Sequence, residues 1–395
     1  MVTSGSEACP PPTKQSFREN IPKATNLVAA LSQSRRPHMF ETLGFEDTTA
    51  RAVSVLFALG LGILFGGLAQ LTRFCFRRAV VGEDRRQAAG VWAMALAVAV
   101  LGTQAGVALG WISFAEHRLM VADLPIAAVI LGGVMFGVGM VLTRGCVSRL
   151  MVLTGSGNLR ALVVIVTFAI VAHATLKGVL APLRTWIGGV TLPVGDYASL
   201  ATLTGAPLVV AAVIAAAALV LALRSGNRAL PLLGGALIGA LVPLAWVGTG
   251  YVLFDEFDPI AMESLSFTAP SAETLFYTLA SSAVPAGFGT GLVGGVLIGA
   301  LVAALLSGSF QWQSFESPRQ TGRYLSGAVL MGIGGVLAGG CTVGAGLAGI
   351  PTLSLAAVLA LVSIAAGGLA ADAWINAAAS GSDAQRATPA VQPAE

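Results

Sequence analysis

Three cysteines recur in similar surroundings, and their thiols are the groups in this sequence best suited to chemistry. The stretch LTRFC ends at Cys75, LTRGC ends at Cys146 and LAGGC ends at Cys341, each at the carboxyl end of an apolar segment. A neutral thiol is a weak donor and a soft acceptor, and apolar surroundings keep it neutral at pH 7. A series of such thiols suits a soft anion with a terminal sulfur atom, because loose binding at several points permits release as well as capture.

The residues next to two of these cysteines favour close contact with a guest. Gly145 precedes Cys146, while Gly340 precedes Cys341 and Thr342 follows it. Glycine lets the backbone bend and approach a bound molecule. If a short helix begins at each cysteine, its free N–H groups favour an anion. The predicted substrate path therefore consists of Cys75, Cys146, Cys341, Gly145, Gly340 and Thr342.

Basic residues near these phrases are candidates for attracting an anion. Arg73 and Arg144 occupy the same place in the first two phrases, although arginines at such positions also orient membrane proteins. Lys177 lies one helical turn after His173 in an apolar segment, and an ionisable pair there is a candidate functional site. The alternative is that Lys177 extends to the lipid headgroups while His173 bonds a neighbouring helix.

Other roles for the three thiols are open. Three thiolates suit Cu(I), but the chain has no C-x-x-C, methionine cluster or nearby histidine. They could also be small core residues. A sulfurtransferase that carries a persulfide needs an activated thiolate with a base, and the phrases contain no His, Asp or Glu close in sequence. We therefore expect a transporter and not an enzyme, with no catalytic residue, metal site or cofactor.

The composition is that of an all-α polytopic membrane protein. The 395 residues are 55% hydrophobic and only 10% charged, whereas soluble domains are about 25% charged. A net charge of +3 is weak evidence for a nucleic-acid partner, and none is expected. Crossing a bilayer takes about 20 apolar residues. Nine segments qualify: 52–72, 87–113, 124–143, 158–181, 206–223, 230–250, 289–307, 323–340 and 353–376. The pieces that follow Gly145 and Gly340 are too short to span, and are predicted to be re-entrant half-helices.

Basic residues are distributed unevenly between the connecting loops. Twelve arginines lie in the loops 73–86, 144–160, 224–229 and 308–323, whereas the alternate loops hold only Arg118 and Arg184. Loop 251–288 has five acidic residues and no basic one. Because positive loops stay in the cytoplasm, the C-terminus is predicted to be cytoplasmic; the side of the N-terminal tail is left open.

Internal repetition accompanies the cysteines. With Cys75 aligned to Cys146, six further positions match, among them Gly62 with Gly133 and Gly66 with Gly137. Small residues recur at helix contacts for packing reasons alone, but packing does not explain the cysteines. Repeated membrane units commonly form a site where they meet. We predict a membrane domain with pseudo-symmetric repeats over 52–376, between a polar tail at 1–51 and another at 377–395.

The three cysteine phrases, with GSGN after the second, resemble the YeeE/YedE membrane family over roughly residues 52–376. Its members carry a sulfur-transport domain and include thiosulfate-uptake proteins. The resemblance implies inner-membrane uptake of thiosulfate through an hourglass-like path in a nine-span fold, with Cys75, Cys146 and Cys341 handling its sulfur. It also implies a small cytosolic sulfur-carrier protein as a partner. A selenium compound or another sulfur oxyanion is the alternative substrate.

Overall fold

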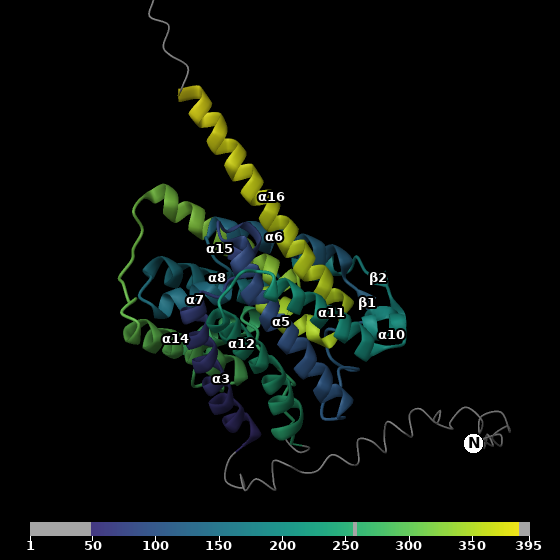
Figure 1. The fold of residues 1–395 in the computed structure, drawn as a ribbon. Helices are drawn as coiled ribbons and strands as arrows, with labels where there is room; N and C mark the ends of the chain where they lie inside the picture. The colour runs from purple at the N-terminus through teal and green to yellow at the C-terminus, as the bar shows by residue number, and fades with distance from the viewer. Residues whose placement is uncertain (1–48, 256–258, 387–395) are drawn as a thin grey trace, which may run out of the picture.

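The fold is a bundle of helices with one small β-ribbon (Figure 1). The computed structural model describes residues 49–255 and 259–386. The long helices are α3 (Ala50–Thr72), α5 (Arg85–Ala108), α6 (Ile126–Leu142), α8 (Leu159–Lys177), α11 (Pro207–Leu223), α12 (Ala229–Val247), α14 (Phe288–Leu306), α15 (Pro318–Leu337) and α16 (Leu355–Arg386). The shorter ones are α4 (Phe76–Val81), α7 (Val147–Gly155), α9 (Ala181–Gly188), α10 (Leu200–Thr204), α13 (Thr268–Leu279), η1 (Gly195–Ala198), η2 (Gly248–Val252), η3 (Thr342–Gly349) and η4 (Ile350–Thr352). Strands β1 (Asp123–Leu124) and β2 (Leu192–Pro193) pair antiparallel.

The prediction of an all-α polytopic membrane protein is confirmed. In the described part of the chain, eight helical segments are long and apolar enough to cross a membrane. The predicted segment 206–223 forms α11, which has 17 residues. Its length of about 26 Å is slightly less than the roughly 30 Å hydrocarbon layer. Each of the nine predicted segments thus forms a helix. Helix α6 also has only 17 residues, and it reaches spanning length together with α7.

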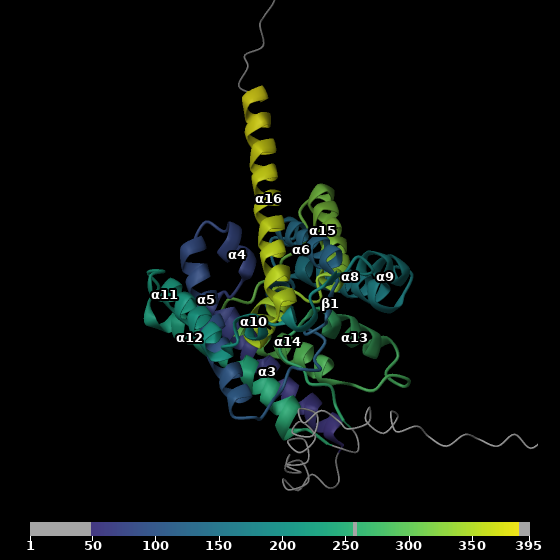
Figure 2. The same cartoon turned by 90° about the vertical axis from the view of Figure 1, so that its right-hand side faces the viewer.

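Two predicted boundaries differ from the structure. Helix α5 ends at Ala108, before the predicted residue 113, because the chain turns at Gly110 with φ of +74°. Helix α16 continues to Arg386 through part of the predicted polar tail. The residues after 376 include a run of alanines, and alanine has the highest helix propensity. Figure 2 shows α16 extending beyond the rest of the bundle. Of the predicted tail at 1–51, residues 1–48 lie outside the described residues, and α3 begins at Ala50.

Glycines allow α3 and α14 to pack backbone against backbone. A Cβ atom at Gly62 of α3 would lie 2.3 Å from the carbonyl oxygen of Leu292 in α14. One turn later, a Cβ at Gly66 would lie 2.3 Å from the carbonyl oxygen of Val296. Because the contacts advance in the same direction along both helices, α3 and α14 run parallel. Such close approach through small residues is typical of helix contacts in membranes.

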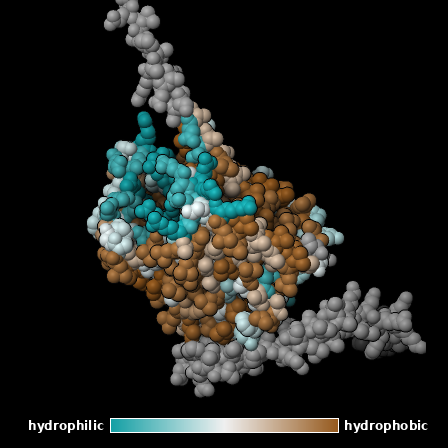
Figure 3. Space-filling view, viewed as in Figure 1, coloured by the Kyte–Doolittle hydropathy of each residue, from teal (hydrophilic) through white to brown (hydrophobic). Residues whose placement is uncertain are grey.

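The four arginine-rich loops lie at one end of the bundle. Parallel α3 and α14 bring the loops that follow them to the same end, where the Leu159 N–H donates to the Gln313 carbonyl at 2.9 Å. The Arg86 guanidinium donates to the Arg224 carbonyl at 2.6 Å, which adds the loop after α11. Figure 3 shows hydrophilic side chains around a hollow at the end from which α16 projects, above a broad hydrophobic belt. The shared location fits the predicted orientation, and the side of the membrane stays a prediction.

Candidate functional site

Each cysteine phrase forms the same local structure: a helix end, a turn and the start of a short helix. The residue two before each cysteine has a left-handed backbone, with φ of 52° at Arg73, 59° at Arg144 and 75° at Gly339. The cysteine that follows is then the N-cap residue of α4, α7 or η3. The short helices expected after the cysteines are therefore present.

The two arginines occupy a backbone conformation that favours glycine. Each lies within a helix-ending turn, in which Phe74 N–H donates to Ala69 and Gly145 N–H donates to Met140, both at 3.1 Å. For a residue with a Cβ atom, the left-handed conformation costs about 1–2 kcal/mol. Since glycine fits these turns better, the backbone alone does not account for Arg73 and Arg144, and a role for their side chains is the simplest explanation.

The three thiols gather in the interior of the bundle. All are free and buried. The sulfur of Cys146 lies 3.4 Å from the Ser148 hydroxyl, and it also interacts with the Cys75 thiol and the Thr342 hydroxyl. The sulfur of Cys341 accepts a hydrogen bond from the Gly344 N–H at 3.4 Å. It also lies close enough to Cys146 for the two thiols to interact electrostatically. Residues from three distant phrases therefore meet in one place.

One side of this thiol cluster opens into a cavity of about 710 Å³, here called the arginine cavity. It lies where α3 and α14 end, and Cys75 is part of its wall. Its basic lining residues are Arg73, Arg77, Arg78, Arg144 and Arg149, and no acidic residue is among the described residues that line it. Arg78 pairs with Asp84 outside the lining, which lowers the pKa of that carboxyl. The cavity therefore carries a strong positive charge beside a thiol.

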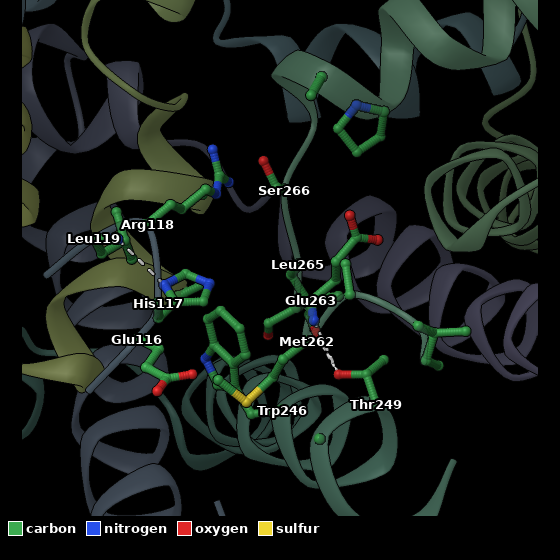
Figure 4. A pocket seen from close by; sticks show the side chains of 18 of the residues that line it. Glu116, His117, Arg118, Leu119, Trp246, Thr249, Met262, Glu263, Leu265 and Ser266 are labelled. Carbon is green, nitrogen blue, oxygen red and sulfur yellow. Dashed lines mark hydrogen bonds between the residues drawn. The ribbon is translucent and has the colours of Figure 1, made fainter. Parts of the chain in front are cut away.

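A second cavity, of about 760 Å³ and here called the acidic cavity, lies where α14 begins. Its walls come from loop 113–119, the end of α12 with η2, segment 260–273 and η3. Its charged lining residues are Glu116, Arg118, Glu263 and Glu273, and His117 lines it as well. Figure 4 shows His117 and Arg118 on one side and Glu263 on the facing segment. Gly344 of η3 is also in the wall, so this cavity reaches the short helix that Cys341 caps.

Other predicted residues lie elsewhere. Lys177 is exposed at the end of α8 and lines neither cavity. The His173 ring stacks on Phe276 with centroids 4.8 Å apart. Gly145 and Gly340 lie in the turns before their cysteines, where a Cβ at Gly340 would be 2.9 Å from the Ala345 nitrogen.

No group of three or more His, Cys, Asp or Glu side chains suited to a metal ion occurs in residues 49–255 and 259–386.

The acidic cavity was missed by sequence reasoning. Loop 251–288 stood out for its charge, and Arg118 for its rarity, but no periodicity linked the two. The available signal was the position of His117, one of three histidines in the chain, beside Glu116 and Arg118 in a short loop. Charged residues clustered in a loop between membrane helices mark a candidate site.

Comparison with known proteins decides the family. The model of the sulphur transport family matches residues 71–370, a range that contains all three cysteines. The chain belongs to this family. It is 27% identical over 345 residues to thiosulfate transporter TsuA of Spirochaeta thermophila, covering 76% of this chain and 93% of that protein. It is 25% identical over 323 residues to thiosulfate transporter TsuA of Escherichia coli, covering 74% and 86%.

The resemblance read from the cysteine phrases is thus confirmed. This sulphur transport protein belongs to a family of transporters and not of enzymes, as the sequence predicted. Family membership accords with the apolar helices that make it a multi-pass membrane protein. It also makes a small sulfur-containing anion the natural class of substrate to test.

Proposed function

We propose that the protein takes up thiosulfate, or a related sulfur-containing anion, across the inner membrane along a path lined by three thiols. The observation that supports this path is the place of the three thiols between two cavities. Cys75 lines the arginine cavity, Cys146 interacts with Cys75 and Thr342, and Cys341 caps the helix that lines the acidic cavity. The names of the two relatives support thiosulfate as the substrate.

The chemistry of the path suits such an anion. The terminal sulfur of thiosulfate is soft and polarisable, and a neutral thiol offers it a weak donor without a full charge. Several weak contacts in succession let the guest move on, which a single strong site would prevent. The arginine cavity then attracts the anion out of the thiol cluster by its charge. Under this proposal Arg73 and Arg144 draw the anion towards the cytoplasm, and an anion-gathering role for Lys177 stays a prediction.

The predicted cytosolic partner would act at the same mouth. A small sulfur-carrier protein that receives the anion would have to approach the arginine cavity, because Cys75 is the thiol that lines it. This part of the proposal rests on the family resemblance.

Transport can be tested in cells that lack other importers of sulfate and thiosulfate. Expression of the protein should give saturable uptake of labelled thiosulfate, with competition by unlabelled thiosulfate and little by sulfate. Intact thiosulfate recovered inside the cell supports transport. A persulfide on one of the cysteines, seen as a mass increase of one sulfur atom, together with loss of the intact anion, would favour the sulfurtransferase alternative. Stronger competition by a selenium-containing anion would reassign the substrate.

The orientation can be tested by adding one cysteine at a time to a Cys9→Ser variant. The three native cysteines that remain in it are buried. Ser282 is exposed between α13 and α14, at the acidic end. We expect Ser282→Cys to react with a membrane-impermeant thiol reagent applied to intact cells whose outer membrane admits it. Trp312→Cys, at an exposed position of the opposite end, should react only after lysis. The reverse pattern would place the C-terminus outside the cytoplasm.

A further inference from the structure

The charge of the acidic cavity is opposite to what an anion-uptake path needs. Among the described residues that line it, Glu116, Glu263 and Glu273 carry carboxyl groups and Arg118 carries the one positive charge. Glu116, Glu273 and Arg118 are exposed, where water weakens their fields, but Glu263 is half-buried. An ionised Glu263 would repel an anion most strongly, because its charge is the least screened. Some feature must therefore neutralise this carboxyl before an anion enters.

The fold holds Glu263 in place without giving its carboxylate a partner. The Thr249 hydroxyl donates to the Glu263 carbonyl at 2.8 Å and accepts from its N–H at 3.0 Å. The side-chain carboxyl receives no hydrogen bond from the described residues, and none of their cationic nitrogens lies within 4.0 Å of it. A half-buried carboxyl without a partner favours its protonated form. Burial, reinforced by Glu273 and opposed by Arg118, raises the pKa of Glu263 to about 7.

His117 faces the same cavity but is not a proton-binding group near neutral pH. Its Nδ1 accepts from the Leu119 N–H at 3.3 Å, and its ring packs edge-on against Trp246 with centroids 5.1 Å apart. It also hydrogen-bonds the Met262 backbone. Burial and Arg118 lower the pKa of His117 to about 4. The neutral imidazole therefore fastens loop 113–119 to the segment that carries Glu263.

In the part of the wall that the structure describes, the other elements bring no further charge to Glu263. Helix α12 and η2 contribute Trp246, Thr249 and Gly250, and η3 contributes Gly344 and Ala348. The charged or titratable groups around it, among the described lining residues, are the ones already named in loop 113–119 and α13.

The cavity that contains Glu263 ends on the helix of the third cysteine. A Cβ at Gly344 would lie 2.6 Å from the Ser266 hydroxyl, so segment 260–273 packs directly on η3. The Gly344 N–H in turn donates to the Cys341 sulfur. An anion that reaches Cys341 from this cavity must enter the space that the Glu263 carboxyl helps to line.

We propose that Glu263 is a proton-binding site of the transport path, and that the anion enters the acidic cavity when this carboxyl carries a proton. The proposal rests on the uptake function proposed above. Protonation removes the repelling charge and converts an acceptor into an O–H donor, which can bond an oxygen of the anion. Uptake should therefore fall as pH rises and Glu263 ionises. Thiosulfate itself stays a dianion near neutral pH, so the change would come from the protein.

The test is initial uptake of labelled thiosulfate into proteoliposomes with the same pH on both sides, which removes any proton gradient. For a group that titrates at about 7, the protonated fraction falls about tenfold between pH 6 and pH 8, and wild-type uptake should fall with it. Glu263→Gln, which keeps the shape and cannot ionise, should retain its pH 6 rate at pH 8. Glu116→Gln, at an exposed position of the same cavity, should keep the wild-type pH dependence.

A second measurement reads the proton directly and does not require transport. Infrared difference spectra of the purified wild type between pH 6 and pH 8 should show a protonated carboxyl band that is lost with a midpoint near 7 and is absent in Glu263→Gln. No thiosulfate uptake at any pH would refute the proposed function, and the infrared band would still test Glu263. Uptake that ignores pH, or that responds to sodium instead, overturns the proton site. The same pH dependence in Glu263→Gln as in wild type does so too.

Discussion

Cys341→Ser is expected to reduce thiosulfate uptake strongly and leave the protein folded. Cys341 caps η3, with its sulfur accepting from the Gly344 N–H. Serine is among the best N-cap residues, so its hydroxyl can replace that acceptor. What serine cannot replace is softness, because a hydroxyl is a harder group with stronger hydrogen bonds to its neighbours. The substitution therefore separates the structural role of Cys341 from its role towards a sulfur-containing anion.

The size of the loss follows from the burial of the site. Cys341 is fully buried, and a buried polar contact left unmade costs about 1–3 kcal/mol. That range corresponds to a decrease of roughly 5- to 150-fold in uptake. Uptake of labelled thiosulfate should be measured at equal protein level in the membrane, with Cys9→Ser as the control that changes a cysteine elsewhere.

Cys341→Ala completes the comparison. Alanine removes the cap and the thiol together, so we expect both reduced thermal stability, by about 1 kcal/mol, and no uptake. If serine restores uptake and alanine does not, a donor or cap is enough and softness is irrelevant. Wild-type uptake in Cys341→Ala would mean that the cysteine only packs, and the thiol path would have to be abandoned.

The sequence predicted the local structure around the cysteines because that structure depends on neighbours in the chain. Arg73 and Arg144 each end a helix two residues before a cysteine, and the next helix begins directly after it. An apolar segment, a turn and a second apolar piece are visible in the letters alone. The meeting of Cys146 with Cys75 and Thr342 is different. It depends on tertiary packing, which neither spacing nor composition encodes in a single sequence.

The acidic cavity shows the same limit more strongly. His117, Trp246 and Glu263 come from three separate parts of the chain. The His117 ring packs on Trp246 and hydrogen-bonds the backbone of Met262, the residue before Glu263. None of them has a periodic partner that would single it out. The burial that raises the pKa of Glu263 arises only when those parts come together.

The aligned glycines of the two LTR phrases have matching environments. In α3, a Cβ at Gly66 would lie 2.3 Å from the Val296 carbonyl oxygen of α14. In α6, a Cβ at Gly137 would lie 2.2 Å from the Ile364 carbonyl oxygen of α16. Helix packing therefore accounts for these glycines, while the repeated cysteines are left to be explained by the path. A glycine at such a contact should matter for stability, whereas a glycine elsewhere in the same helix should not.

Gly62→Ala is expected to destabilise the protein, and Gly60→Ala is its matched control. Both glycines lie in α3, and alanine gains up to about 1 kcal/mol of helix propensity over glycine at either position. A Cβ at Gly60 meets nothing within 4 Å, whereas one at Gly62 would lie 2.3 Å from the Leu292 carbonyl oxygen. Backbone cannot rotate away as a side chain can, so α3 and α14 must separate, at a cost of about 1–3 kcal/mol or more.

The first measurement is the thermal midpoint of the purified protein in detergent, read from the loss of the monodisperse peak on size-exclusion chromatography. The second is the protein level in the membrane. Gly60→Ala should match or exceed wild type, and Gly62→Ala should fall well below it. Because the two variants share helix, substitution and propensity, their difference isolates the backbone contact between α3 and α14. Equal midpoints would mean that these helices do not pack as closely as Gly62 and Leu292 require. The position of Cys75, which follows α3 and lines the arginine cavity, would then need to be reconsidered.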